Sequence, residues 1–173
     1  GVQVKLDRSG RVTMFSGASD IGQGSDSVLM TIACEELGVR PEHVRVVSSD
    51  TDLTPVDLGA YSSRVTLMMG HAALEACRRL REQVQEAVAR EWQCAPDDVL
   101  FGHGKVWSRD NTSKSITTAE AFKHAEVRFG TLGSTGGYRT HPRGGDYRGG
   151  TIGASPAYSA TAHVAEVEVA TET

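Results

Sequence analysis

The sequence has little cysteine, no long apolar run and no excess of basic residues, and each absence excludes a class of protein. Its three cysteines, Cys34, Cys77 and Cys94, are widely spaced, so they suggest neither a disulfide framework nor a CxxC metal or iron–sulfur motif. This usage is typical of a reducing compartment, and we expect a cytoplasmic protein. No apolar run approaches the roughly 20 residues of a transmembrane helix. With 18 Lys and Arg against 22 Asp and Glu, the chain lacks the basic excess of nucleic-acid-binding proteins.

The length and composition are those of one folded domain. The chain has 173 residues, of which 39% are hydrophobic and 23% charged, which argues against disorder over the whole length. The chain begins at Gly1 with no recognisable signal peptide, and it stops at Thr173 where a turn and a return strand are expected. We therefore expect a domain cut from a longer chain, with ordinary trimming of the ends as the alternative.

Hydrophobic periodicity predicts an α+β fold. The first part of the chain is expected to form a β-hairpin, a helix and a buried strand, over residues 2–15, 26–37 and 44–47. Ser25 is a suitable N-cap for that helix, and Gly38 is a suitable left-handed C-cap. The order of the elements predicts a mixed sheet with one long amphipathic helix and two shorter helices.

The longest predicted element is a helix from Val65 to Trp92. This stretch contains no proline, and apolar residues recur every three or four positions, which predicts an amphipathic helix with one exposed face. Gly70 costs this helix about 1 kcal/mol relative to alanine, so we expect a close-packed neighbour there. A second hairpin, a short helix and a final strand are expected over residues 97–108, 117–124 and 157–173, whereas the nine glycines of residues 130–153 argue against a regular element.

The first candidate site is the segment between the first hairpin and the first helix, Ile21-Gly22-Gln23-Gly24-Ser25. Glycine lets a ligand approach the backbone closely, and the free amides at the start of a helix attract anions. Gln23 adds an amide donor and an acceptor. The alternative is a plain tight turn before a helix.

Dinucleotide binding is a weaker interpretation of the same segment. Gly22 and Gly24 follow a strand and precede a helix, and Asp50 ends the next strand at a suitable distance. However, the third glycine of G-x-G-x-x-G falls at Ser27, and the preceding strands are expected to form a hairpin rather than to open a βαβ unit.

The second candidate site is Tyr61-Ser62-Ser63-Arg64, at the start of the long helix. Two hydroxyls, several unpaired backbone amides and a fixed positive charge meet there, which suits a phosphate or a pyrophosphate. The alternative is that Ser62 merely caps the helix and that Arg64 is solvated.

The sequence offers no catalytic group and no set of metal ligands. The six histidines show no metal-ligand spacing, and none lies near a cysteine. There is neither a P-loop nor a G-x-S-x-G motif, and we expect Asp50 and Asp52 to make turn hydrogen bonds. We therefore assign no catalytic and no metal-binding residue.

Several motifs occur in an order that indicates a known family. They are Asp20-Ile21-Gly22-Gln23-Gly24-Ser25, then residues 32–39, 44–55 and 57–66, and Ala165-Glu166-Val167-Glu168-Val169 near the end. Together they cover nearly the whole chain, and they resemble the molybdenum-cofactor-binding subunit of the xanthine dehydrogenase/aldehyde oxidase family. The Gly-Ala-Tyr-Ser-Ser-Arg variant at residues 59–64 looks closest to 4-hydroxybenzoyl-CoA reductase-type and related bacterial enzymes.

The resemblance implies a molybdenum–molybdopterin cofactor, either with a cytosine nucleotide or without one. Ile21 to Ser25 would contact the pterin and its phosphate, and Tyr61 to Arg64 would approach the pterin or the pyrophosphate of its nucleotide. Enzymes of this family hydroxylate a carbon with water, or reductively dehydroxylate in the hydroxybenzoyl-CoA branch. Their electrons pass through [2Fe–2S] clusters and usually FAD, which are expected on other domains or subunits. Those subunits and the remaining domains of the molybdenum subunit are the partners that the resemblance implies.

Three motifs of that family are absent from the chain. The glycine-rich G-G-x-F-G-G-K-type loop, the arginine-bearing F-R-G-type segment and the Gly-Glu motif of the catalytic glutamate do not occur. We therefore expect residues 1–173 to be a single molybdenum-cofactor-binding domain, excised from a larger catalytic subunit and inactive alone. The alternative is a non-catalytic binding module of the same fold without a pterin. The sequence does not specify the substrate.

Overall fold

The computed structural model describes residues 1–140, 157 and 161–172. These residues contain three α-helices and seven strands, which confirms the α+β class. In chain order the elements are β1 (Val2–Leu6), β2 (Val12–Ser16), α1 (Ser25–Leu37), η1 (Pro41–His43), β3 (Val44–Ser48), α2 (Arg64–Trp92), η2 (Pro96–Asp98), β4 (Val99–Gly102), β5 (Lys105–Ser108), β6 (Ser115–Thr117), α3 (Thr118–Phe129) and β7 (Gly133–Gly136). Among them, no helix is long and apolar enough to cross a membrane.

The larger sheet is mixed and has the strand order β3-β2-β1-β7. Strand β1 is antiparallel to both β2 and β7, whereas β2 is parallel to β3. The sequence expectation that the first hairpin excludes a βαβ unit was wrong, because β2 belongs to the hairpin and also opens the unit β2-α1-β3. In such a unit the helix starts beside the carboxyl ends of two strands, which is a common place for an anion.

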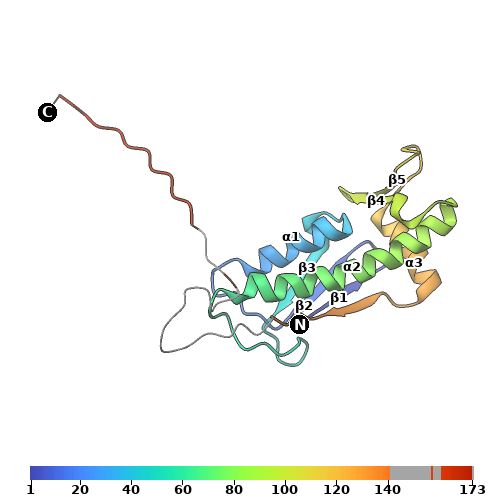
Figure 1. Ribbon diagram of the computed structural model, residues 1–173, viewed down its shortest axis with the longest axis horizontal. Helices are drawn as coiled ribbons and strands as arrows, with labels where there is room; N and C mark the ends of the chain where they lie inside the picture. Colours follow the sequence, from blue (N-terminus) through green and yellow to red (C-terminus); the bar gives the residue numbers. More distant parts are fainter. Residues whose placement is uncertain (141–156, 158–160, 173) are drawn as a thin grey trace.

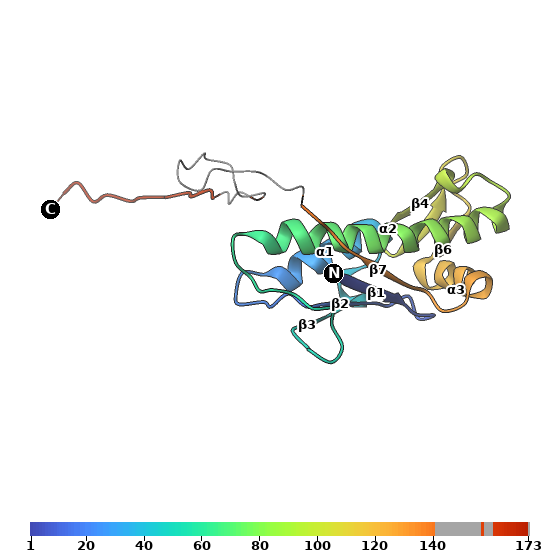
Figure 2. The ribbon, with the colours of Figure 1, turned by 60° about the horizontal axis from the view of Figure 1, so that its bottom comes forward.

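Helices α1 and α2 lie side by side and cover one face of this sheet (Figures 1 and 2). Val2, Val4 and Leu6 of β1 are buried, while Lys5 between them is exposed, so only one face of the strand carries the core. Helix α2 has the predicted amphipathic pattern and begins at Arg64, one residue before the predicted start. Gly70 is buried, and a Cβ there would lie 3.4 Å from Ile32 of α1, which confirms the expected close-packed neighbour.

The second sheet, of order β4-β5-β6, lies with α3 near the carboxyl end of α2 (Figure 1). The predicted second hairpin is confirmed as β4 and β5, with Pro96–Asp98 forming a short 3₁₀ turn before it. Thr117 caps α3 in a capping box with Glu120. The helix continues to Phe129, beyond the predicted end at His124, because Gly130 is the first residue that breaks it.

Two expectations for the carboxyl-terminal third were wrong. The glycine-rich stretch contains a regular element after all, since β7 pairs with β1 from Gly133 to Gly136; its remaining residues from 141 to 153 lie outside the described ones. The predicted final strand is not formed by residues 161–172. Val164, Val167 and Val169 are 99%, 78% and 71% exposed, so their alternation has no sheet to pack against.

Candidate functional site

The first glycine segment connects the carboxyl end of β2 to the start of α1. Gly22 and Gly24 have φ values of 96° and 77°, in the left-handed region that glycine adopts without strain. Gly24 is the residue that precedes the first turn of α1. A Cβ at either glycine would meet no atom within 4 Å, so the backbone is open to a ligand at both positions.

The amides of this segment already hold an anion of the chain itself, the Asp20 carboxylate. Asp20 Oδ1 accepts a hydrogen bond from the Gly22 amide at 2.9 Å, and Oδ2 accepts one from the Asp26 amide at 3.2 Å. The hydrogen bonds from Gly22 and then Asp26 are the main reason why the pKa of Asp20 lies below its ordinary value of 3.8. The expectation that Ser25 caps α1 was wrong, because Gly24 occupies the N-cap and Asp20 supplies the acceptor from upstream.

Gln23 and Ser25 have different roles in the same segment. Gln23 Oε1 accepts a hydrogen bond from the Ile21 amide at 2.6 Å, and its Nε2 donates to the Ser19 carbonyl at 3.0 Å. Ser25 is only 4% exposed. Its hydroxyl lies close enough to Asp20 to add slightly to the lowering of that pKa, but Oγ makes no hydrogen bond of ordinary geometry with any described residue. A buried hydroxyl without a partner is unfavourable, and an anion in the segment could satisfy it.

The second candidate segment forms the start of α2. Ser62 and Ser63 have φ values of 55° and 53°, a left-handed conformation that serine rarely adopts and that often marks a functional segment. No side-chain hydrogen bond caps α2, and its N-cap is Ser63, so the alternative in which Ser62 serves as the cap was wrong. Tyr61 and Ser62 are exposed to solvent.

Arg64 is held inside the chain. Its Nη1 donates to Asp57 Oδ1 at 3.0 Å and to the Gly59 carbonyl at 2.8 Å. The side chains of Arg64 and Asp57 are only 12% and 2% exposed, and the Tyr61 ring centroid lies 5.3 Å from the guanidinium carbon. The alternative of a solvated Arg64 was therefore wrong, and the arginine fixes the loop that precedes α2.

The loop between β3 and α2, residues 49–63, crosses the chain at Gly17, directly after β2; we call it the crossing loop. A Cβ at Gly17 would collide with the Pro55 carbonyl oxygen, so only glycine allows this crossing. The loop is tied back to β2 because the Ser49 amide donates to the Ser16 carbonyl at 3.2 Å. Residues 17 and 55, far apart in the sequence, are thereby in contact.

A side-chain hydrogen bond also connects β3 to α1. Ser48 Oγ donates to Asp26 Oδ2 at 3.0 Å, which joins the end of β3 to the first turn of α1. A pocket of about 260 Å³ lies under the crossing loop, and its lining includes four hydroxyls, from Ser19, Ser49, Thr51 and Thr54. Its lining comes from the connection between β2 and α1 and from the loop that leads to the second candidate segment.

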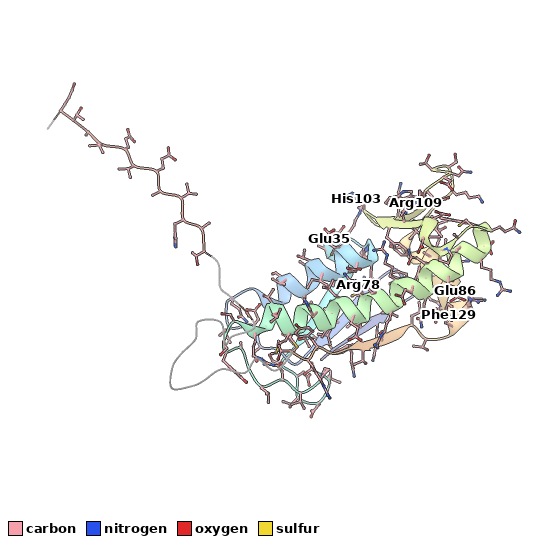
Figure 3. The ribbon with its side chains drawn as sticks, viewed as in Figure 1. Glu35, Arg78, Glu86, His103, Arg109 and Phe129 are labelled. Carbon is pink, nitrogen blue, oxygen red and sulfur yellow. The ribbon has the colours of Figure 1, made fainter. Side chains whose placement is uncertain are left out.

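Helices α1 and α2 begin at the same end of the domain, as the two views in Figures 1 and 2 agree. The parallel strands β2 and β3 also end there. The larger depressions of the described residues lie elsewhere, including one of about 860 Å³ between α2 and α3. Figure 3 shows Arg78 and Glu86 further along α2, away from its start.

Sequence reasoning missed three residues that shape this end. Gly17 and Asp57 act through the crossing loop, and neither has a local signal that would have identified it. Asp20 does have one, since an aspartate two residues before a glycine is typical of an Asx turn. The described residues contain no group of three or more histidines, cysteines or carboxylates that could hold a metal ion.

Comparisons with known proteins indicate the family of this chain. The whole chain, residues 1–173, matches the molybdopterin cofactor-binding domain family. It is 38% identical over 146 residues to the xanthine dehydrogenase molybdenum-binding subunit of Escherichia coli O157:H7, covering 81% of this chain and 19% of that protein. It is 40% identical over 101 residues to the gamma subunit of the 6-hydroxypseudooxynicotine dehydrogenase complex of Paenarthrobacter nicotinovorans, covering 58% of this chain and 13% of that protein.

A solved structure shares the fold. The crystal structure of quinoline 2-oxidoreductase from Pseudomonas putida 86 superposes with a TM-score of 0.70 at 26% identity, over 79% of this chain and 18% of that one. The chain thus spans less than a fifth of the length of each of these three proteins. The chain belongs to the molybdopterin cofactor-binding domain family.

The residues of this chain fit such a cofactor at the end where α1 and α2 begin. The open backbone at Gly22 and Gly24 leaves room for a ligand, and the buried Ser25 hydroxyl lacks a partner among the described residues. Amides and hydroxyls are the donors that a phosphate requires.

Proposed function

We propose that this domain binds the molybdopterin cofactor at the end where α1 and α2 begin. The amides of Ile21 to Ser25 and the side chain of Gln23 hold the pterin and its phosphate. Tyr61 to Arg64 line the opposite side, with exposed Tyr61 and Ser62 towards the ligand and Arg64 fixing the backbone behind them. The observation that supports this most is that two glycine- and serine-rich helix starts lie at one end of the domain, where the buried Ser25 hydroxyl makes no hydrogen bond of ordinary geometry with a described residue.

We further propose that the domain is part of a molybdenum-dependent oxidoreductase and is inactive alone. When bound, the cofactor supplies two-electron oxidation or reduction of a substrate carbon with water as the oxygen source or product. In this proposal the described residues bind and orient the cofactor, and none of them is assigned a catalytic role. The sequence resemblance favours the 4-hydroxybenzoyl-CoA reductase type, a pterin with or without a cytosine nucleotide, and [2Fe–2S] and FAD on other domains or subunits of a cytoplasmic enzyme.

The remaining domains of the molybdenum subunit are the partners that we propose for this end. Five large apolar side chains are exposed on the two candidate segments and the crossing loop: Ile21 (72%), Leu53 (57%), Val56 (89%), Leu58 (74%) and Tyr61 (55%). Such a group of apolar side chains is typical of a protein interface, and cofactor sites often lie between domains. A cofactor bound here would be covered by that partner.

The test is the molybdenum and pterin content of the purified full-length protein. Gln23→Ala should lower both, because the variant loses the amide that shapes the Ile21–Ser25 segment. Gln83→Ala is the matched control, since Gln83 lies well along α2, and it should leave both unchanged. A full-length protein that carries no pterin would instead favour the non-catalytic module of the same fold.

A second expectation concerns the 173-residue chain alone. It should bind the pterin cofactor weakly, because a ligand held from one side loses both burial and orientation. Equilibrium dialysis measures this directly. Retention of the cofactor at sub-micromolar concentration by the chain alone would contradict the proposal that a partner completes the site.

A further inference from the structure

The Asp20 carboxylate occupies the Gly22 amide, which the proposed function assigns to a phosphate, and the nearby Asp26 amide in the first turn of α1. It accepts hydrogen bonds from the amides of Gly22 and Asp26 at 2.9 and 3.2 Å. It has no ion-pair partner among the described residues. The helix start therefore already holds one negative charge, and a second anion cannot use the same two amides at the same time.

We propose that Asp20 is an internal competitor of the cofactor phosphate, which holds the amide cradle when the domain is empty and leaves it when the phosphate binds. This inference rests on the proposed function. It gives Asp20 a role beyond accepting a hydrogen bond at the start of α1. Cofactor binding then exchanges the carboxylate for a phosphate at the same amides.

The surroundings of Asp20 allow such an exchange. Asp20 is exposed, and the backbone beside Gly22 and Gly24 is open. The carboxylate can therefore swing into water without moving a packed element. Ser25 Oγ is buried and lies near Asp20, but it makes no hydrogen bond of ordinary geometry with a described residue. A phosphate has more acceptor oxygens than a carboxylate and could satisfy this hydroxyl in addition to the two amides.

A neighbouring charge makes the competition stronger. Asp26 lies in the first turn of α1, where one carboxylate oxygen accepts from Ser48 and the other is buried without a partner among the described residues. With Asp20 in place, an entering phosphate meets two carboxylates at one helix start. Removal of Asp20 takes away one of these two charges and frees the two amides.

The experiment measures binding of inorganic phosphate to the 173-residue chain at neutral pH. The probes are the ¹⁵N amide shifts of Gly22, Gly24 and Asp26, with folding checked by circular dichroism. Asp20→Ala should bind phosphate at these amides about tenfold more tightly than the unmodified chain, since hydrogen bonds to charged groups are worth at least that factor. Asp20→Asn keeps an acceptor but loses the charge, so its affinity should be intermediate, and this variant also guards against a loss of folding in Asp20→Ala.

Asp7→Asn is the matched control. Asp7 also accepts backbone amide hydrogen bonds, from Ser9 at 2.8 Å and Arg11 at 3.1 Å, but it lies in the turn between β1 and β2. Its substitution removes the same charge and should leave the phosphate affinity at Gly22, Gly24 and Asp26 unchanged. An equal gain in Asp7→Asn and Asp20→Asn would show a general charge effect and overturn the inference.

The outcomes separate this inference from the proposed function. Unchanged phosphate binding in both Asp20 variants overturns the competition, whatever the molybdenum content of the full-length protein. Tighter phosphate binding in the variants, together with a full-length protein that carries no pterin, supports Asp20 as an internal anion and overturns the cofactor as its competitor.

Discussion

At the scale of single residues, the Asp57–Arg64 pair shows how a site residue can act through its neighbours. The spacing of the sequence places Arg64 beside two hydroxyls at the start of a helix, where a cation is unfavourable unless an anion offsets it. The anion present in the structure is Asp57, seven residues upstream and 2% exposed. The pair also fixes the Gly59 carbonyl, so Arg64 determines the course of the backbone through Ser62 and Ser63.

Arg64→Ala is expected to lower the molybdenum content of the full-length protein more than Arg79→Ala does. The substitution leaves Asp57 buried without a counter-ion, which destabilises a protein by about 3–5 kcal/mol. Arg79 is 57% exposed, so its loss should change the stability by less than about 0.5 kcal/mol. Molybdenum per protomer and urea unfolding measure the two effects.

Asp57→Ala separates a positioning role of Arg64 from a direct contact with the cofactor. If Arg64 acts by fixing the loop, Asp57→Ala should reduce molybdenum as much as Arg64→Ala does. If the guanidinium instead contacts the phosphate, Asp57→Ala should retain more molybdenum. Equal molybdenum loading in the Arg64 and Arg79 variants would remove Arg64 from the site altogether.

At the scale of elements, strand β7 was missed because its sequence, Gly-Ser-Thr-Gly, has neither β-branched enrichment nor hydrophobic alternation. Its place is determined by packing. A Cβ at Gly136 would collide with the Ala72 carbonyl oxygen in α2, so glycine there allows the strand to lie directly against the helix. One of the glycines that argued against a regular element is therefore what allows this strand to pack against α2.

Gly136→Ala is therefore expected to destabilise the chain by about 1–3 kcal/mol, as overpacking usually does. Gly137→Ala is the control, because a Cβ at that adjacent position meets nothing within 4 Å. Urea unfolding of the two variants gives the comparison. If both variants unfold at the same urea concentration, then the close approach of β7 to α2 does not limit stability.

The capping box of α3 predicts a pH dependence. Hydrogen bonds from the Thr117 amide and then the Thr117 hydroxyl lower the pKa of Glu120 below its ordinary value of 4.5. A lowered carboxyl pKa stabilises the fold above the ordinary value, and this contribution is lost as the pH falls through the lower pKa of the folded state. The stability difference between the unmodified chain and Glu120→Gln should be largest above about pH 4.5 and should shrink towards acid, as urea unfolding between pH 3 and 7 would reveal. A difference that does not vary with pH would contradict this assignment.

At the scale of the whole molecule, the exposed apolar side chains are unevenly distributed. Among residues 1–140, five of them belong to the end where α1 and α2 begin, while Val127 and Phe129 lie on α3 near the other end. A buried core runs between these ends, from Val2 and Met14 of the larger sheet to Val84, Val99 and Phe122. The apolar end is therefore not needed for the core of the described residues, which suits a surface that another domain covers.

The double substitution Val56→Asn with Leu58→Asn should leave the stability of the chain unchanged within about 0.5 kcal/mol, because both side chains are exposed. In the full-length protein the same change should lower molybdenum content and expose residues 49–63 to hydrogen exchange. Val127→Asn is the control, because Val127 is 84% exposed on α3. It should change neither the molybdenum content nor the hydrogen exchange of residues 49–63. Hydrogen exchange that is already fast over residues 49–63 in the unmodified full-length protein would show that nothing covers this loop.

The sequence alone determined the elements that depend on local periodicity and local chemistry. The first hairpin, helices α1 and α2 and the Gly38 cap all follow from patterns within a few residues of each other. The two candidate segments were also identified in this way, because glycine and serine before a helix are a local signal. Only for α3 was a helix end misplaced by several residues, since nothing before Gly130 stops it.

Only the tertiary structure determined which groups meet at the candidate site. The parallel pairing of β2 and β3, the crossing of Pro55 over Gly17, and the burial of Asp57 against Arg64 join residues that no local pattern connects. The same reason explains why the Val164–Val169 alternation forms no strand in the described residues, since a strand requires a neighbour to supply its hydrogen bonds. Local patterns determine which residues form a helix or a loop. Contacts between residues that are distant in the sequence determine how the loops are arranged around the starts of α1 and α2.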